Sequence, residues 1–296
     1  MKNIRKQSSA VGILLAGGNG SRLYPLTHAI NKHLLPIFDK PMFFHPLSSL
    51  MLAQIRTIIF IVRPSDLEQY KSFFQDGSSL GVEIIYKTQP NPIGIPDAYT
   101  LTELEIANKN SLLVLGDNIL LGQGMANQLT IPDDFEGARI FGFPVNNPSE
   151  YGVLDYDYGS RKIRRIMEKP QEFVSNLAIP GLYFMDSTVC ERVSELLPSK
   201  RGELEIVELL NHYLKDGDLN VEIFQRGVGW LDAGTIESLY LASETIKVLQ
   251  DRQGLMFANP DEIAWRNGWI DDKQLLKNVS RWGSTKYSEY LKALLN

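Results

Sequence analysis

Short apolar runs alternate with longer amphipathic segments through the first half of the chain. The apolar runs are rich in leucine and β-branched residues, which is typical of strands covered on both faces of a sheet. The segments between them repeat apolar residues at helical spacing. The predicted strands are residues 11–16, 57–62, 82–86, 111–115 and 139–144, and the predicted helices are residues 43–54, 67–74 and 98–107. This alternation predicts an α/β fold with a mostly parallel sheet.

The second half of the chain follows a less regular pattern. Strands are predicted at residues 151–156, 164–168, 177–185 and 221–225, with helices at 204–214 and 238–251. After Gly254 the chain alternates short helical pieces with Trp265, Trp269 and Trp282. Such a tail fits either a helical cap on the core or a subunit interface, because apolar aromatic residues suit both. The predicted organisation is a core over residues 1–237 and a C-terminal helical extension over residues 238–296.

Composition narrows the class of protein. The 296 residues are 44% hydrophobic and 22% charged, with a net charge of −5, which argues against a nucleic-acid-binding face. The single cysteine, Cys190, excludes an internal disulfide and a cysteine metal cluster, and we expect it to be a small buried residue. The polar residues 1–10 lack the apolar core of a secretory signal, and no apolar run could span a bilayer. We therefore expect a cytoplasmic protein with no membrane partner.

A glycine-rich loop follows the first predicted strand. Gly17, Gly18 and Gly20 surround Asn19, and Ser21 and Arg22 come next. Glycines let a ligand approach backbone N–H groups, and an arginine adds a planar cationic donor, so the loop is a candidate phosphate site. Its spacing fits neither the P-loop nor the dinucleotide-binding pattern. A tight turn with a surface arginine is the alternative interpretation of the loop alone.

Lys32 and His33 follow this loop closely in the chain. Lys32 could fold back toward the same phosphates, although by itself a solvated lysine in a turn is the favoured interpretation. We expect His33, a lone histidine beside a lysine, to be a polar surface residue.

Three acidic positions lie where predicted strands or turns end. Asp117 is the first charged residue after a fully apolar strand, and a carboxylate there commonly holds Mg²⁺ against substrate phosphates. Asp232 lies in a glycine-bounded turn before a helix and could share the cation. Glu168 and Lys169 end another strand, where the lysine could contact a sugar or phosphate group. The alternatives are a turn aspartate, a helix cap and a surface ion pair, respectively.

The ordered set of these motifs resembles the sugar nucleotidyltransferases over about residues 11–272. The set comprises Leu-Leu-Ala-Gly-Gly-Asn-Gly-Ser-Arg-Leu (14–23), Lys-His-Leu-Leu-Pro (32–36), Asp-Lys-Pro-Met (39–42), Leu-Gly-Asp-Asn (115–118), Glu-Lys-Pro (168–170), Gly-Leu-Tyr-Phe (181–184), Arg-Gly-Glu-Leu-Glu-Ile (201–206), Trp-Leu-Asp-Ala-Gly-Thr (230–235) and Arg-Gln-Gly-Leu (252–255). The resemblance implies a Rossmann-like three-layer sandwich with a mixed, mostly parallel sheet. It also implies a nucleotide half at about residues 11–120 and a sugar-phosphate half at about residues 121–237.

The resemblance implies that the phosphate oxygen of a sugar 1-phosphate, D-glucose 1-phosphate in the α form, attacks the α-phosphorus of dTTP and that pyrophosphate leaves. Arg22, Lys32 and Lys169 would hold the phosphates, while Asp117 and Asp232 would hold Mg²⁺ as the cofactor. Gln89 and Gly94 would contact the base. The positions matching the family's sugar-phosphate contacts are Gly152, Glu168, Ile179, Tyr183 and Arg201. The helical tail matches the family's longer members, which are implied to be homotetramers.

Several positions depart from the family's pattern. Pro96 and Asp97 stand where the family usually has alanine and glutamine near the base, which leaves UTP or CTP as alternative nucleotides. Another hexose 1-phosphate also stays open, as does a non-catalytic relative that only binds nucleotide sugars. Met256 replaces a lysine of the family's second, regulatory nucleotide site, so feedback control by a nucleotide sugar is left open. The remaining departures are His33 for glutamine, Pro180 for threonine and Ala233 for threonine.

Overall fold

The computed structural model describes residues 6–122, 124–132 and 134–296. Residues 1–5, which the predicted core includes, lie outside the described part of the chain. The strands are β1 (Val11–Ala16), β2 (Pro36–Ile37), β3 (Lys40–Pro41), β4 (Thr57–Val62), β5 (Glu83–Thr88), β6 (Ser111–Leu115), β7 (Asn118–Leu121), β8 (Ala138–Pro144), β9 (Gly152–Asp157), β10 (Lys162–Glu168), β11 (Leu177–Ala178), β12 (Leu182–Met185), β13 (Leu219–Ile223) and β14 (Gly229–Asp232).

The α-helices cover both faces of the sheet and extend beyond it. They are α1 (Phe44–Leu52), α2 (Leu67–Phe74), α3 (Asp97–Leu101), α4 (Glu103–Ile106), α5 (Met125–Gln128), α6 (Val189–Ser194), α7 (Ile206–Asp216), α8 (Ile236–Gln253), α9 (Pro260–Arg266), α10 (Asp272–Arg281) and α11 (Lys286–Ala293). Short 3-10 helices span Ser21–Leu23, Lys32–Leu34, Pro64–Asp66, Ser78–Leu80 and Pro148–Glu150.

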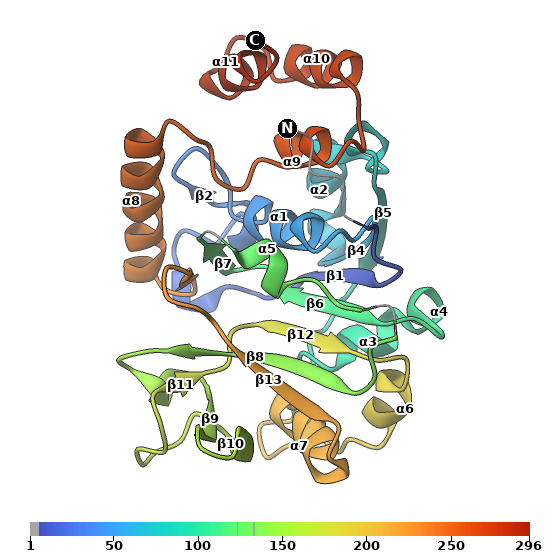
Figure 1. The fold of residues 1–296 in the computed structure, drawn as a ribbon, viewed down its shortest axis with the longest axis vertical. Coiled ribbons are helices and arrows are strands. Elements are labelled where there is room, and N and C mark those ends of the chain that lie inside the picture. Colours follow the sequence, from blue (N-terminus) through green and yellow to red (C-terminus); the bar gives the residue numbers. More distant parts are fainter. Residues whose placement is uncertain (1–5, 123, 133) are drawn as a thin grey trace.

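A ten-stranded mixed sheet runs through the molecule in the order β10-β9-β11-β8-β12-β6-β1-β4-β5, with β13 paired to β8 (Figure 1). The strands β6, β1, β4 and β5 are parallel, so their carboxyl ends share one edge. β12 is antiparallel to both β6 and β8. The predicted α/β class, with a mixed sheet built around parallel strands, is confirmed.

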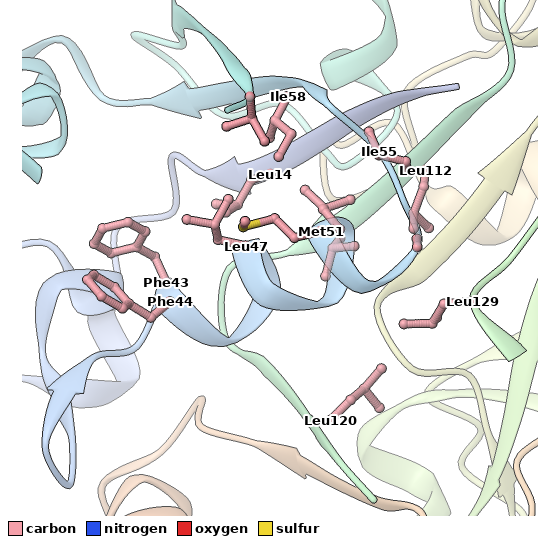
Figure 2. Close-up of a cluster of buried hydrophobic side chains, with 14 of the residues drawn as sticks. Leu14, Phe43, Phe44, Leu47, Met51, Ile55, Ile58, Leu112, Leu120 and Leu129 are labelled. Atoms are coloured by element: carbon pink, nitrogen blue, oxygen red, sulfur yellow. The ribbon is translucent and has the colours of Figure 1, made fainter. Parts of the chain in front are cut away.

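Side chains of the central strands alternate between two cores. Leu14 on β1 belongs to the core beneath α1 and α2, whereas its neighbour Ile13 belongs to the core beneath α3, α6 and α7. Figure 2 shows Leu47 and Met51 of α1 directed toward Leu14 and Ile58 of the sheet. A strand buried on both faces needs apolar residues at every position, which explains the nearly continuous apolar runs in the sequence.

Several predicted elements differ from the observed ones. The predicted strand 177–185 is two strands, because Ile179, Pro180 and Gly181 separate β11 from β12. The predicted helix 98–107 breaks at Thr102, whose hydroxyl donates to the Ala98 carbonyl at 2.8 Å. The paired strands β7 and β14 lie in segments where no strand was predicted. Each has only four residues, and its apolar positions alone do not distinguish a strand from a turn.

The C-terminal helices pack on the α1 and α2 side of the core. Trp282 lies against Phe44 and Phe74, with ring centroids 6.4 and 6.3 Å away, and its Nε1 donates to buried Asp261 at 3.2 Å. The segment after Gly254 is therefore helical and packs on the core of its own chain. None of the helices in the described ranges is long and apolar enough to cross a membrane. Cys190 is free and half-buried instead of fully buried.

We expect buried His45 on α1 to make the protein less stable as the pH falls. Burial, followed by the positive charge of Lys40, lowers the pKa of His45 to about 3, whereas its usual value is 6.5. The unfolded chain therefore binds the proton more readily, so stability present above pH 6.5 is lost progressively between pH 6.5 and 3. At pH 5 the loss from this residue is about 2 kcal/mol.

Denaturant unfolding at pH 7.5 and pH 5 measures this difference. His45→Leu removes the titrating group and should shrink the loss between the two pH values by about 2 kcal/mol. The same substitution at exposed His28 is the matched control and should leave the loss unchanged. An unaltered pH dependence in His45→Leu would contradict the assignment.

Candidate active site

A cavity of about 390 Å³ opens at the carboxyl ends of the parallel strands and extends to β9 and β10. Ligands in open α/β sheets bind at this edge. Most of the predicted site residues line it, namely Gly18, Arg22, Gln89, Gly94, Asp117, Gly152, Glu168, Lys169, Ile179, Tyr183, Arg201 and Asp232. The other predicted residues, Gly17, Asn19, Gly20, Ser21 and Lys32, do not line its wall, but they belong to segments that border it.

The glycine loop leaves β1 and turns directly into the 3-10 helix Ser21–Leu23. Gly20 adopts the left-handed φ of 62°, and its carbonyl accepts a hydrogen bond from Thr27 Oγ1 at 2.7 Å. A Cβ atom on Gly17 would lie 2.8 Å from Gln89 Oε1, so only glycine leaves room for that amide. Asn19 and Ser21 are exposed. The loop thus places its backbone and Arg22 beside the cavity.

Lys32 reaches a carboxylate in the cavity wall instead of solvent. Its Nζ lies 2.5 Å from Asp117 Oδ2, and its side chain is 13% exposed. Asn31 holds the turn, since its side chain accepts from His33 N at 2.9 Å and donates to the Ala16 carbonyl at 3.1 Å. The interpretation of Lys32 as a solvated lysine was therefore wrong. Contacts between distant segments decided its position.

His33 is buried, which contradicts the expectation of a polar surface residue. It is 2% exposed and its Nδ1 lies 2.9 Å from Asn31 Oδ1. Burial, followed by the charge of Lys32, lowers its pKa to about 3. The ring packs against Gly116, where a Cβ would lie 2.6 Å from His33 Cδ2. His33 is therefore neutral and supports the turn that carries Lys32.

The pairing of β7 with β14 brings the two aspartates together. Asp232 is the last residue of β14 and lies opposite Asn118, while Ala233 N donates to the Asp117 carbonyl at 3.1 Å. Asp232 is not a helix cap, because Thr235 caps α8 through its side chain. Asp232 also adjoins Arg22, since a Cβ on Gly234 would lie 3.0 Å from both Asp232 Oδ1 and Arg22 Nη2.

The protein shifts the pKa values of the two carboxyl groups in opposite directions. Burial, followed by the negative charge of Asp117, raises the pKa of Asp232 to about 6. Burial would also raise the pKa of Asp117, but the Lys32 ammonium outweighs it and holds that pKa well below its usual range. The arrangement concentrates negative charge that one lysine does not fully neutralise.

This donor set fits a hard divalent cation. Mg²⁺ usually binds through one or two carboxylates and completes its shell with water and substrate phosphates. Asp117 and Asp232 could supply two such carboxylates, and no cluster of three or more His, Cys, Asp or Glu suited to a metal occurs within the described residues. A site of this kind holds its metal together with a phosphate ligand.

The opposite wall of the cavity is built from β9, β10 and the segment between β11 and β12. Glu168 pairs with Gly152 across the ladder, and Ile179 N donates to the Gly152 carbonyl at 2.8 Å. Burial raises the pKa of Glu168, although Lys169 opposes this effect. Lys169 Nζ lies 3.7 Å from Glu168 Oε1, so the pair also forms the predicted ion pair, at the cavity instead of on an open surface.

Tyr183 and Arg201 complete this wall. Tyr183 is 4% exposed and burial raises its pKa above the usual range. Arg201 binds Glu205 through two hydrogen bonds, at 3.1 and 2.8 Å. Tyr183 is held by burial and Arg201 by its ion pair, and both side chains border the cavity.

Gly94 joins the two walls. It has φ of 125° and forms an isolated parallel bridge with Leu204, and Leu204 N donates to the Ile93 carbonyl at 2.7 Å. A Cβ on Gly94 would lie 2.0 Å from the Leu204 carbonyl oxygen, so no other residue fits this crossing. The bridge ties the segment that carries Arg201 to the segment that follows Gln89.

Sequence reasoning assigned no role to three further lining residues. Asn118 Oδ1 accepts from Trp230 Nε1 at 2.7 Å and from Gly181 N at 2.9 Å, while its Nδ2 donates to Asp117 Oδ1 at 3.1 Å. Tyr151 packs edge-on against Trp230 with centroids 5.0 Å apart. Asn118 adjoins Asp117 in the chain, and Trp230 lies two residues before Asp232. Their closeness in the sequence to the two candidate aspartates was the signal that could have identified them.

A second cavity of about 460 Å³ lies between the β2–β3 hairpin, α8 and the C-terminal helices. Met256 is part of its wall, with Lys40, Gln250 and Tyr287 among the other lining residues. It is separate from the cavity that contains the aspartates.

Comparison with known proteins agrees with this geometry. The nucleotidyl transferase family profile matches residues 11–248. Glucose-1-phosphate thymidylyltransferase of Neisseria meningitidis is 45% identical over 96% of this chain and 99% of its own length. The enzyme of that name from Mycobacterium tuberculosis (strain H37Rv) is 44% identical over 96% of this chain and 98% of its own.

Solved structures show the same fold. A crystal structure of a proposed glucose-1-phosphate thymidylyltransferase from Bacillus anthracis, in complex with sucrose, has a TM-score of 0.73 and 38% identity. It covers 80% of this chain and 95% of its own. A UDP-glucose pyrophosphorylase complexed with UDP-glucose, at 22% identity, covers 81% of this chain and 99% of its own with a TM-score of 0.72, which supports the fold alone. The chain belongs to the nucleotidyl transferase family.

Proposed function

We propose that this nucleotidyltransferase condenses dTTP with α-D-glucose 1-phosphate to give dTDP-glucose and pyrophosphate, with Mg²⁺ as the cofactor. The observation that carries the proposal is the pairing of β7 with β14, which brings Asp117 and Asp232 together in a cavity that Gly18 of the glycine loop and Lys169 also line. The curated relatives named glucose-1-phosphate thymidylyltransferase support the choice of substrates.

The reaction needs charge and position more than covalent help. A phosphate oxygen of the sugar phosphate forms a bond to the α-phosphorus of the nucleotide. The bond between the α-phosphorus and the oxygen that links it to the β-phosphorus breaks, and pyrophosphate leaves with that electron pair. The attacking phosphate is already an anion at neutral pH, so no general base is required. When bound, Mg²⁺ supplies Lewis-acid stabilisation of negative charge on the phosphates.

The chain's own residues hold the two substrates in line. In this proposal the loop of Gly17, Gly18, Asn19, Gly20 and Ser21 surrounds the triphosphate. Arg22 stabilises the departing pyrophosphate. The Lys32 ammonium leaves Asp117 and binds the triphosphate. Gln89 and Gly94 contact the base. Lys169 holds the sugar phosphate, and the residues that contact the sugar are Gly152, Glu168, Ile179, Tyr183 and Arg201.

Pyrophosphate release tests the proposal. The assay crosses dTTP, UTP, dCTP and CTP with glucose 1-phosphate and other hexose 1-phosphates, with and without Mg²⁺. We expect the highest kcat/KM for dTTP with glucose 1-phosphate and no release without a divalent cation. Faster turnover of another pair would replace the substrate assignment. Nucleotide binding without turnover of any pair would favour a non-catalytic relative.

Lys169 provides a test of the sugar-phosphate wall. We expect Lys169→Met to raise the KM for glucose 1-phosphate by about 10- to 100-fold, because one charge-assisted phosphate contact of about 1.5–3 kcal/mol is lost. The KM for dTTP should change little. Lys162→Met, at the exposed start of β10, the strand that Lys169 follows, is the matched control. Equal increases in both KM values would contradict the placement of Lys169 at the sugar phosphate.

The homotetramer and the cytoplasmic location stay predictions. Light scattering coupled to size-exclusion chromatography measures the first, and fractionation of cells that make the protein measures the second. The division at residue 237 between core and helical extension is likewise a proposal, which limited proteolysis tests.

A further inference from the structure

Gln89 is held by a single acidic residue. It follows β5, is 2% exposed and lines the cavity. Its Nε2 donates to Asp97 Oδ2 at 2.7 Å. Asp97 is the first residue of α3 and is half-buried. The contact therefore ties the amide in the cavity wall to the start of the neighbouring helix.

This contact fixes which end of the amide faces the ligand. An ionised carboxylate only accepts hydrogen bonds, so the NH₂ group of Gln89 must face Asp97 and the carbonyl must face away. Oε1 accordingly lies toward the glycine loop, where a Cβ on Gly17 would be 2.8 Å from it. Turning the amide over would place a carbonyl oxygen against the carboxylate, which replaces an attraction by a repulsion.

Gln89 is the amide left available for reading a ligand. The other side-chain amide in the cavity wall, Asn118, already uses both Oδ1 and Nδ2 within the protein. Among the residues that the structure describes, no hydrogen bond is donated to Gln89 Oε1. Nε2 also has a second hydrogen beyond the one directed to Asp97. Gln89 thus presents one acceptor, Oε1, and one donor, Nε2–H, to a ligand, and Asp97 fixes which of the two lies on which side.

We propose that Asp97 is a positioning residue that makes the nucleotide site select an imide base, thymine or uracil, against cytosine. An imide offers an N3–H donor beside a carbonyl acceptor, which matches Oε1 and Nε2–H of Gln89 as Asp97 holds them. Cytosine offers an N3 acceptor beside an N4–H donor, which matches only the reversed amide. The inference rests on the proposed function for the location of the base at Gln89.

Equilibrium binding tests the inference without requiring turnover. The binding of dTTP and dCTP, which share their sugar and phosphates, is measured by calorimetry with Mg²⁺ and no sugar phosphate. We expect the wild-type chain to favour dTTP. Asp97→Asn allows either amide orientation, because asparagine both donates and accepts. The ratio of the two dissociation constants should therefore fall by at least about tenfold, since an orientation that the carboxylate opposed becomes accessible.

Two further variants make the result specific. Asp97→Ala removes the partner altogether and should lower the ratio in the same direction. Glu103→Gln removes one negative charge from an exposed position at the start of α4 and should leave the ratio unchanged. A purely structural role of Asp97 would weaken both nucleotides equally.

An unchanged ratio in both Asp97 variants, or no preference in the wild type, would overturn the inference. Failure of the proposed function has a different signature. In that case dTTP and glucose 1-phosphate would release no pyrophosphate, while the binding ratio and its response to Asp97→Asn would still be measurable.

Discussion

Asp117→Asn should lower kcat by about a thousandfold, roughly 4 kcal/mol of lost transition-state stabilisation. The substitution keeps the size of the side chain but removes one of the two carboxylates that would hold Mg²⁺. It also replaces the charged partner of the Lys32 ammonium by a neutral amide. The measurement is pyrophosphate release from saturating dTTP and glucose 1-phosphate over a range of Mg²⁺ concentrations. The variant should need far more Mg²⁺ for its residual activity.

The control is a half-buried aspartate outside the cavity. Asp186 follows β12 and accepts hydrogen bonds from Gly137 N at 2.7 Å and Tyr213 Oη at 3.0 Å. Asp186→Asn should reduce stability without changing the Mg²⁺ dependence. If Asp117→Asn kept wild-type turnover at millimolar Mg²⁺ while remaining folded, the assignment of Asp117 as a metal ligand would be wrong.

Arg22→Ala is expected to lower kcat by about 100- to 1,000-fold, which is the usual consequence of removing one preorganised donor from a site of developing charge. Arg22 lines the cavity beside Asp232 and follows the glycine loop directly. Because the proposed role of Arg22 is to stabilise charge on the leaving group, the KM for glucose 1-phosphate should change little. Steady-state kinetics in both substrates separate these effects.

Arg22→Lys keeps the charge and loses the planar donor fork, so it should recover only part of the activity. Arg252→Ala, at the exposed end of α8, removes an equal charge elsewhere and should have no effect on kcat. A loss confined to the KM for the sugar phosphate in Arg22→Ala would indicate that this arginine binds the other substrate.

The positions of β1, β4 and β6 follow from local pattern. Each is a mostly apolar run followed by a glycine or a charged residue, and the predicted bounds of each match the observed ones. The carboxyl ends of parallel strands share an edge, so the sequence also placed the glycine loop and Asp117 on one rim. The strand 177–185 was predicted as continuous because a Pro-Gly break between two apolar runs changes the hydrophobic pattern very little.

The sequence by itself determined the α/β class, the central parallel strands and the set of polar residues at their ends. Only the tertiary structure decided that Lys32 reaches Asp117, that His33 is buried, that Asp232 ends a strand opposite Asn118, and that Asp97 orients Gln89. The physical reason is the separation along the chain between the residues that interact. Hydrophobic periodicity is a property of neighbouring residues, whereas most of these contacts join distant segments of the chain, such as Lys32 and Asp117, which are 85 positions apart. The orientation of Gln89 depends on which atom of an amide faces a carboxylate.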